Sequence, residues 1–326
     1  MSTAFYYDRM NSLYKKNNIL LKFRWVVRGA YQRARELPIA YTKKMFLYYY
    51  INTMKDKKNS VKEEYSGFID SPIWISLYND FKRILYWTED SLVQKINNNI
   101  LQDLDIIQKQ NLDVCDIWWS DGKRISHILK YMNWLFKIKF NLDFCEQSKI
   151  CVDMFDTSVI ADFCQTTKYA LRFEDMPVMQ KYDLIFLIHS IFTFKDKQAL
   201  DKLMQLKKTD GNIIIVSNWS QSFLAWLKKI VDSDYLDTRM EIDAVINYLD
   251  TNKIQYHKKS FKTVWCQDKI SYDDKIAVLL NWISLAQYNN FSSSKKAAIK
   301  KYINDNSVLC QWSKVLFEEE EIVIVI

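Results

Sequence analysis

The apolar positions of this 326-residue chain change their spacing near residue 111, and the change divides the chain in two. Up to that point apolar residues recur three or four positions apart, which is the spacing of amphipathic helices. A helix expected over 89–110 shows this spacing best, with an apolar stripe of Leu92, Ile96, Ile100, Leu104 and Ile107. Residues 1–110 are therefore expected to form an N-terminal helical region.

Beyond residue 111, short apolar runs alternate with helical stretches. The expected strands cover 112–117, 138–144, 169–173, 182–188 and 212–217. The helical stretches between them cover 125–136, about 147 onward, 197–206 and 221–231, and a turn is expected at 209–211. This alternation is typical of a parallel sheet that helices cover on both faces.

The end of the chain follows a different pattern. An expected strand over 254–265 precedes helical stretches at 276–287 and 295–303, and two last apolar runs, 315–317 and 322–326, flank four glutamates. This order predicts a final antiparallel hairpin. The fold class predicted is α/β, with a doubly wound, mostly parallel seven-stranded sheet and an antiparallel C-terminal strand. The domain would cover 111–326, with a helical insertion at about 270–305.

Composition excludes several classes of protein. The chain has 4 Gly and 3 Pro, and because no two glycines lie close together it has no G-x-G-x-x-G dinucleotide fingerprint and no P-loop. Its six cysteines form no C-x-x-C pair, so neither a zinc site nor a disulfide framework is expected. No secretory signal and no apolar run of roughly 18 residues is visible, which predicts a cytoplasmic protein.

Positive charge is concentrated at the start of the chain. The net charge is +7, but residues 1–62 alone hold 14 Lys and Arg against three acids, a local charge of +11, among many aromatic residues. Three interpretations fit: a helical arm whose basic side chains lie along the protein body, a surface for an anionic membrane or substrate, and a nucleic-acid contact. Nucleic acid fits least, because the rest of the chain carries a net charge of −4.

In an open parallel sheet, ligands bind beyond the carboxyl ends of the strands, where the strand order reverses. Residues that follow the expected strands are therefore the candidates for a site. They are Asp116 and 118–122 after the first strand, Asp143 after the second, 174–177 near the third, His189 and Ser190 after the fourth, and 217–219 after the fifth.

The order of these elements resembles that of class I S-adenosylmethionine-dependent methyltransferases, from residue 111 to the end of the chain. The matching pieces are Asp116–Gly122, Asp143 with Glu146–Ser148, Glu174–Pro177, Tyr182–Ile188 with its Tyr-Asp-Leu-Ile start, and Gly211–Ser217. The resemblance implies a Rossmann-like methyltransferase domain with S-adenosylmethionine as its cofactor.

The resemblance also implies roles for individual residues. The cofactor-binding residues would be Asp116, Trp118, Ser120, Gly122, Asp143, Asp175, Met176 and Ile188. Among them Asp143 would accept hydrogen bonds from the ribose hydroxyls, Asp175 would contact the adenine, and Gly122 would form a tight turn. His189 would act as general base toward a small-molecule acceptor that is methylated at oxygen or nitrogen, such as a sugar or another natural-product precursor.

The chain departs from the family pattern at the glycine-rich loop. In place of three alternating glycines it has Trp118, Ser120 and Gly122. If the Trp118 indole fills the methionine pocket, the chain is a catalytically inactive binding or scaffold protein. A nucleic-acid methyltransferase is a further hypothesis, with the charge of residues 1–62 as its only support.

A second register for the ribose carboxylate also exists. In it 150–153 is the second strand and Asp153 replaces Asp143. The distance along the chain from Gly122 favours Asp143, which lies 21 residues on, over Asp153, which lies 31 residues on.

Overall fold

The computed structural model describes residues 86–101, 104, 109–117, 121–178, 180–194, 196–218, 222–223, 226–227, 230, 240–266, 291–306, 308–309 and 315–326. The basic segment 1–62, most of the expected N-terminal helical region and the expected helix at 276–287 lie outside these residues.

Strands and helices alternate through the described part of the chain. The strands are β1 Asn111–Ile117, β2 Lys139–Glu146, β3 Cys164–Ala170, β4 Tyr182–Ile188, β5 Lys207–Asn218, β6 His257–Cys266, β7 Val308–Leu309 and β8 Val315–Val325. The α-helices are α6 Tyr86–Asn99, α7 Lys123–Phe136, α8 Lys149–Met154, α9 Lys197–Leu206, α11 Ile242–Thr251 and α13 Ser293–Asn306. Short 3-10 helices are η3 Thr157–Ile160, η4 Phe173–Asp175 and η5 Ile191–Thr193.

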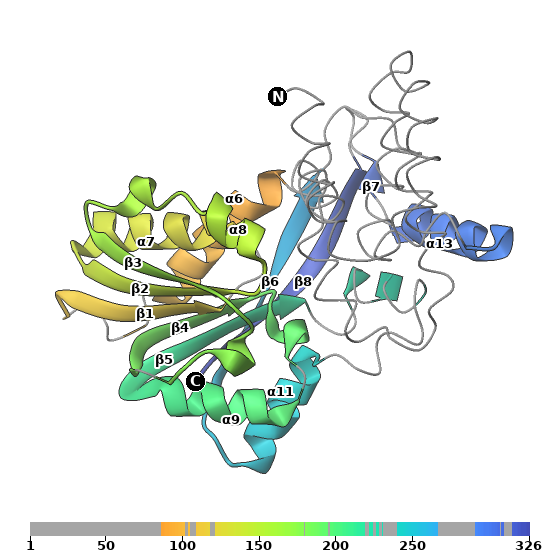
Figure 1. The fold of residues 1–326 in the computed structure, drawn as a ribbon. Helices are drawn as coiled ribbons and strands as arrows, with labels where there is room; N and C mark the ends of the chain where they lie inside the picture. The colour runs from red at the N-terminus through yellow and green to blue at the C-terminus, as the bar shows by residue number, and fades with distance from the viewer. Residues whose placement is uncertain are drawn as a thin grey trace, which may run out of the picture. The chain divides into compact units, whose positions relative to one another are not determined.

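These strands form one sheet in the order β3-β2-β1-β4-β5-β8-β6, with the two-residue β7 paired to β8 (Figure 1). Strands β1 to β5 are parallel, and β8 runs antiparallel to both β5 and β6. The expected mostly parallel sheet with seven main strands and an antiparallel C-terminal strand is confirmed. The strand order reverses between β1 and β4, which is where a sheet of this kind holds its ligands.

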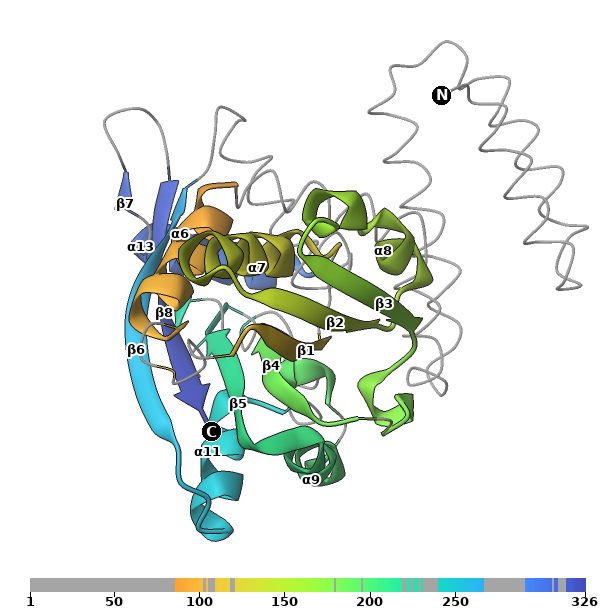
Figure 2. The ribbon, with the colours of Figure 1, turned by 90° about the vertical axis from the view of Figure 1, so that its left-hand side faces the viewer.

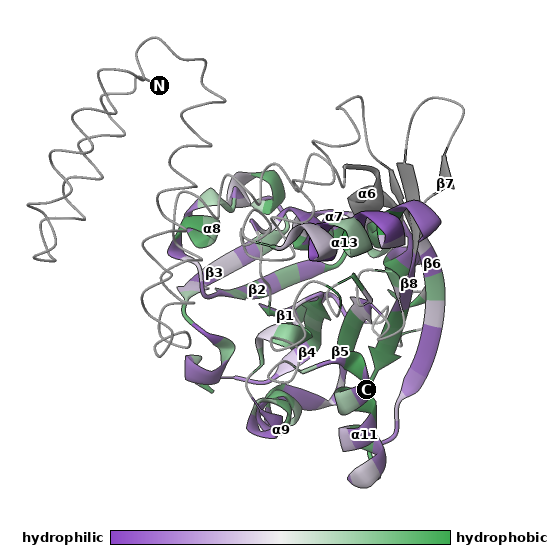
Figure 3. Cartoon of the chain, turned by 90° about the vertical axis from the view of Figure 1, so that its right-hand side faces the viewer, coloured by the Kyte–Doolittle hydropathy of each residue, from purple (hydrophilic) through white to green (hydrophobic). Residues whose placement is uncertain are grey.

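Helices cover both faces of the sheet, with α6, α7 and α8 on one face and α9 and α11 on the other (Figures 1 and 2). Adjacent residues of β4 point to opposite faces: Phe186 packs with Ile128 of α7 in a first core cluster, and Ile185 packs with Leu203 of α9 in a second core cluster. Strand β4 is buried along its whole length, and Figure 3 shows polar positions in purple along the first part of β6, at the far side of the sheet. No helix among the described residues is long and apolar enough to cross a membrane.

The structure corrects three expectations about local structure and excludes one alternative. The third strand is Cys164–Ala170 rather than 169–173, and the expected turn at 209–211 is part of β5. Residues 150–153 lie in α8, so the second register with Asp153 is wrong. Helix α6 ends at Asn99, although its expected stripe is buried at residues 92, 96, 100 and 104.

Ion pairs join the central strands at their amino ends. Asp183 on β4 accepts hydrogen bonds from Lys109 Nζ at 2.7 Å, from Lys208 Nζ at 2.8 Å and from the Asp113 backbone N–H at 2.8 Å. Burial opposes ionisation of Asp183, but the hydrogen bonds outweigh burial and hold its pKa below the usual range. The network therefore stabilises the sheet at the amino ends of its central strands, away from their carboxyl ends.

Replacing Asp183 with Asn should lower the free energy of unfolding by about 2 kcal/mol at pH 7, because two partly exposed lysines lose a buried anion. The folded-state pKa of Asp183 is lowered, so its contribution should be complete at neutral pH and fade as the pH falls below about 4. Urea unfolding of both proteins at pH 7 and pH 3.5 measures the two differences. A difference that does not shrink with pH would contradict this role.

Candidate functional site

Polar side chains from four strands gather on one face of the sheet near the carboxyl ends of its parallel strands. Each lies two or four residues from a strand residue of the first core cluster. Because side chains alternate along a strand, they all point to the face that α6, α7 and α8 cover. They are Asp116 on β1, Glu146 on β2, Asn218 on β5, and Glu319 and Glu321 on β8.

Asp116 is the most unusual of these groups. Its side chain is 1% exposed, and its Oδ1 has no hydrogen-bond partner among the residues that the structure describes. Burial raises the pKa of Asp116 to about 8, although the charge of Arg124 on α7 opposes this shift. The site therefore holds a carboxyl group that a positively charged ligand would ionise.

Gly122 begins α7 in the left-handed region, with φ of 72°. Its carbonyl accepts hydrogen bonds from the Ser126 backbone N–H at 3.1 Å and from Ser126 Oγ at 2.9 Å. A Cβ at this position would lie 2.4 Å from the Phe155 ring. Gly122 thus has a left-handed conformation that suits a tight turn, and both this conformation and the close ring favour glycine.

The carboxylate at the end of β2 is Glu146 rather than Asp143. Asp143 lies inside the strand and points to the second core cluster, where Tyr182 Oη donates to its Oδ2 at 2.6 Å and Gln180 Nε2 donates at 3.0 Å. Glu146 is fully buried on the same face as Asp116, and its Oε1 accepts from the Ser148 N–H at 2.7 Å. The expectation that Asp143 follows the strand is therefore wrong.

A local signal could have identified Glu146. Ser148 caps α8, and its side chain accepts from the Cys151 N–H. Because a serine at the start of a helix marks a helix boundary, β2 has to end just before Ser148, which leaves Glu146 as its terminal acid.

The segment after β3 does not place both of its expected residues at this site. Met176 is buried in the second core cluster, so it is packed on the other face of the sheet from Asp116, and Asp175 is exposed. Lys202 of α9 fixes the segment by donating to the carbonyls of Phe173, Glu174 and Met176. A cofactor contact from Met176 is thus not supported by its packing, and one from Asp175 stays a prediction.

His189 directly follows β4 and has a positive φ of 57°. Its side chain is 23% exposed, and its Nε2 lies 3.5 Å from Glu321 Oε2 on β8. His189 directly follows the fourth strand, as expected, whereas its partner Glu321 is not indicated by any sequence pattern. Ile188, the last residue of β4, is buried in the first core cluster beside this site.

Two of the expected cofactor residues, Trp118 and Ser120, lie outside the described residues. Whether the Trp118 indole fills a pocket therefore stays a prediction, as do the roles expected for residues 1–62.

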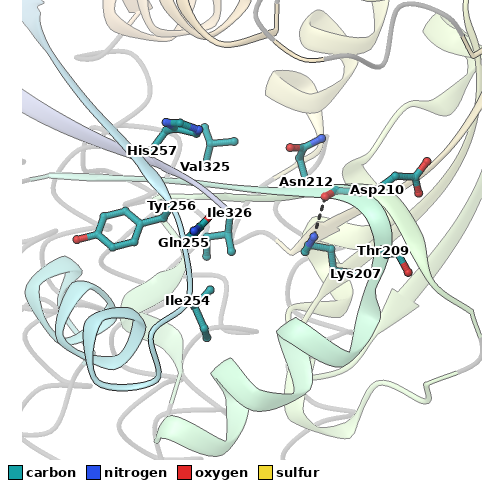
Figure 4. A pocket seen from close by; sticks show the side chains of 11 residues that line it. Lys207, Thr209, Asp210, Asn212, Ile254, Gln255, Tyr256, His257, Val325 and Ile326 are labelled. Carbon is teal, nitrogen blue, oxygen red and sulfur yellow. Dashed lines mark hydrogen bonds between the residues drawn. The ribbon is translucent and has the colours of Figure 1, made fainter.

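A separate hollow of 670 Å³ opens at the amino end of β5, away from the carboxyl ends of the parallel strands. Its wall comes from the start of β5, the segment before β6 and the end of β8, and Lys207 on one side donates to the Gly211 carbonyl at 3.0 Å (Figure 4). None of the residues expected to bind a cofactor lines this hollow. Since ligands of such sheets bind at the carboxyl ends of the strands, the candidate site is the one with Asp116 and Glu146.

No family model and no curated protein matches the sequence. Similar solved structures include the YcgJ protein of Bacillus subtilis, which is 14% identical, with 74% of this chain and 97% of that chain covered and a TM-score of 0.46. A putative methyltransferase of Bacillus halodurans is 12% identical, with 72% and 96% covered and a TM-score of 0.45.

A third similar structure is the geranyl diphosphate C-methyltransferase of Streptomyces coelicolor. It is 11% identical, with 73% of this chain and 78% of that chain covered and a TM-score of 0.42, and it was solved with Mg²⁺, geranyl diphosphate and S-adenosyl-L-homocysteine. The solved structures found thus include methyltransferases, the class of protein that the sequence resembles.

Proposed function

We propose that the chain is an S-adenosylmethionine-dependent methyltransferase that acts on an oxygen or nitrogen of a small molecule. The observation that carries the proposal is the buried carboxyl group of Asp116 at the carboxyl end of β1, with one oxygen unpaired among the described residues. It lies beside the reversal of strand order, where a ligand is expected.

The described residues fit this cofactor. S-adenosylmethionine carries a sulfonium and an ammonium group, and a buried carboxylate stabilises a neighbouring cation strongly because little water screens the pair. Glu146 would accept hydrogen bonds from the ribose hydroxyls in the place first assigned to Asp143, and Gly122 would let the backbone approach the cofactor closely. When bound, the sulfonium supplies an activated methyl group.

His189 would serve the acceptor side of the site. It follows β4, on the other side of the strand reversal from Asp116. An imidazole titrates near neutral pH, so it can take a proton from an acceptor hydroxyl under physiological conditions. The acceptor would be a small molecule. If it is anionic, the basic segment 1–62 would help to bind it.

Calorimetric titration with S-adenosylmethionine and with S-adenosylhomocysteine tests the proposal. We expect binding of both by the parent chain and at least tenfold weaker binding of S-adenosylmethionine by Asp116→Asn, because the cation loses its counter-charge. Asp162→Asn, which changes an exposed carboxylate between η3 and β3, is the matched control. No binding at millimolar ligand would remove the enzyme assignment, and binding that appears only in Trp118→Gly would favour the scaffold alternative.

A further inference from the structure

The backbone conformation of His189 places its side chain on the opposite face of the sheet from the one that strand alternation predicts. Its N–H donates to the Val216 carbonyl at 2.7 Å, as in a regular strand, but its φ of 57° is left-handed. Regular alternation would send residue 189 to the face of Leu187, which belongs to the second core cluster. The imidazole instead reaches Glu321, which lies on the face of the first core cluster.

A left-handed conformation in a residue other than glycine costs about 1–2 kcal/mol, and such strain persists only where the surrounding structure enforces it. The contact between His189 and Glu321 is therefore a specific feature of this fold rather than a consequence of strand geometry.

The Glu321 carboxylate is held by both strands that flank β8. Its Oε1 accepts from Thr263 Oγ1 on β6 at 3.2 Å and from Asn218 Nδ2 on β5 at 3.5 Å. The side chain is fully buried. With Oε1 engaged in this way, Oε2 is the oxygen that faces His189 Nε2, at 3.5 Å.

We propose that Glu321 is a positioning residue that keeps the proton of neutral His189 on Nε2 and leaves Nδ1 as the proton acceptor. This inference rests on the proposed function for its purpose, since Nδ1 would then take the proton of an acceptor hydroxyl. In that step the O–H bond breaks, an N–H bond forms at Nδ1, and the electron pair stays on the oxygen, which becomes the nucleophile. Glu321 stabilises the imidazolium that results.

A second buried acidic side chain lies two residues before Glu321 on the same strand. Glu319, which is also fully buried on β8, accepts from Asn218 Nδ2 at 3.4 Å. On α13, Tyr302 stays neutral, because burial and then the charge of Glu319 raise its pKa to about 12. Glu319 and Glu321 thus share the Asn218 amide, and Glu321 is the one whose contact with His189 is described.

Nuclear magnetic resonance of the imidazole nitrogens tests this role directly, because the chain has only three histidines. His189→Asn assigns the His189 signals. In the parent chain at high pH we expect a protonated Nε2 and an unprotonated Nδ1. In Glu321→Gln we expect the proton affinity of His189 to fall at least tenfold and the preference for the Nε2–H tautomer to weaken. Glu319→Gln, the matched control, should lower the proton affinity by less.

Predominant Nδ1–H in the parent chain, or an unchanged proton affinity in Glu321→Gln, would overturn the proposal. The tautomer of the parent chain is read without Glu321→Gln, so a folding defect in that variant would not leave the question open. Since neither cofactor nor acceptor is added, a negative result here is distinct from a failure to bind S-adenosylmethionine.

Discussion

Without ligand, the Asp116→Asn variant should be more stable than the parent chain at pH 8, by about 2–5 kcal/mol. Burial raises the folded-state pKa of Asp116 to about 8, far above the value of 3.8 for an exposed aspartate. At pH values between these two pKa values, Asp116 is protonated in the folded state but ionised in the unfolded state. The stability of the parent chain therefore falls as the pH rises through this window, whereas a neutral asparagine adds no such dependence.

Urea unfolding from pH 4.5 to pH 8 measures this effect as the difference in free energy between parent and variant. The difference should grow steadily with pH. Asp162→Asn, which changes an exposed carboxylate, should show no such growth. Parallel pH profiles for the parent chain and Asp116→Asn would mean that Asp116 ionises normally, and the basis for a cation site would be lost.

The second large effect is expected for Gly122→Ala, which should lower the free energy of unfolding by about 3 kcal/mol. The left-handed φ of 72° is unfavourable for alanine, and the new methyl group would lie 2.4 Å from the Phe155 ring. Because the turn also begins α7 beside Asp116, the variant should bind S-adenosylmethionine more weakly as well.

A double-mutant cycle with Phe155→Leu separates the two causes of this loss. Leucine is smaller than phenylalanine, so it should relieve the overlap with the new methyl group but not the backbone strain. The double variant should therefore be more stable than the sum of the single effects predicts, by about 1 kcal/mol. Additive effects would show that the ring imposes no constraint on Gly122.

The best-predicted elements are those whose burial is visible in the local pattern. Strand β4 and helix α9 have the bounds expected from the sequence, because β4 is a continuous apolar run buried on both faces and α9 buries one regular stripe. Strand β3 was misplaced because it lies at the edge of the sheet with mostly exposed or half-buried polar side chains, so no apolar run marks it.

Gly211 misled the prediction for a different reason. A glycine between polar residues is typical of a turn, but here it permits close approach of two strands: a Cβ at Gly211 would lie 2.5 Å from the Tyr182 carbonyl oxygen. The two readings of such a glycine cannot be separated without knowing which strand lies next to it.

The candidate site could be located from the sequence but not resolved to individual side chains. The rule that ligands bind at the carboxyl ends of strands selects Asp116, Gly122 and His189, and the structure has them near the end of β1, at the start of α7 and directly after β4. Asp143 and Glu146 lie on opposite faces of β2, and only Glu146 ends the strand, because the strand runs two residues further than its apolar pattern indicates. The contact between His189 and Glu321 joins residues 132 positions apart through an unusual backbone angle, which no local pattern encodes.

The proposed site is tested most directly by the number of protons released when S-adenosylmethionine binds at pH 7. Calorimetry in phosphate and in Tris, whose ionisation enthalpies differ, gives that number. The carboxyl group of ligand-free Asp116 is mostly protonated at pH 7, and a bound cation would ionise it. We predict release of close to one proton by the parent chain and none by Asp116→Asn. Equal binding enthalpies in the two buffers for the parent chain would contradict it.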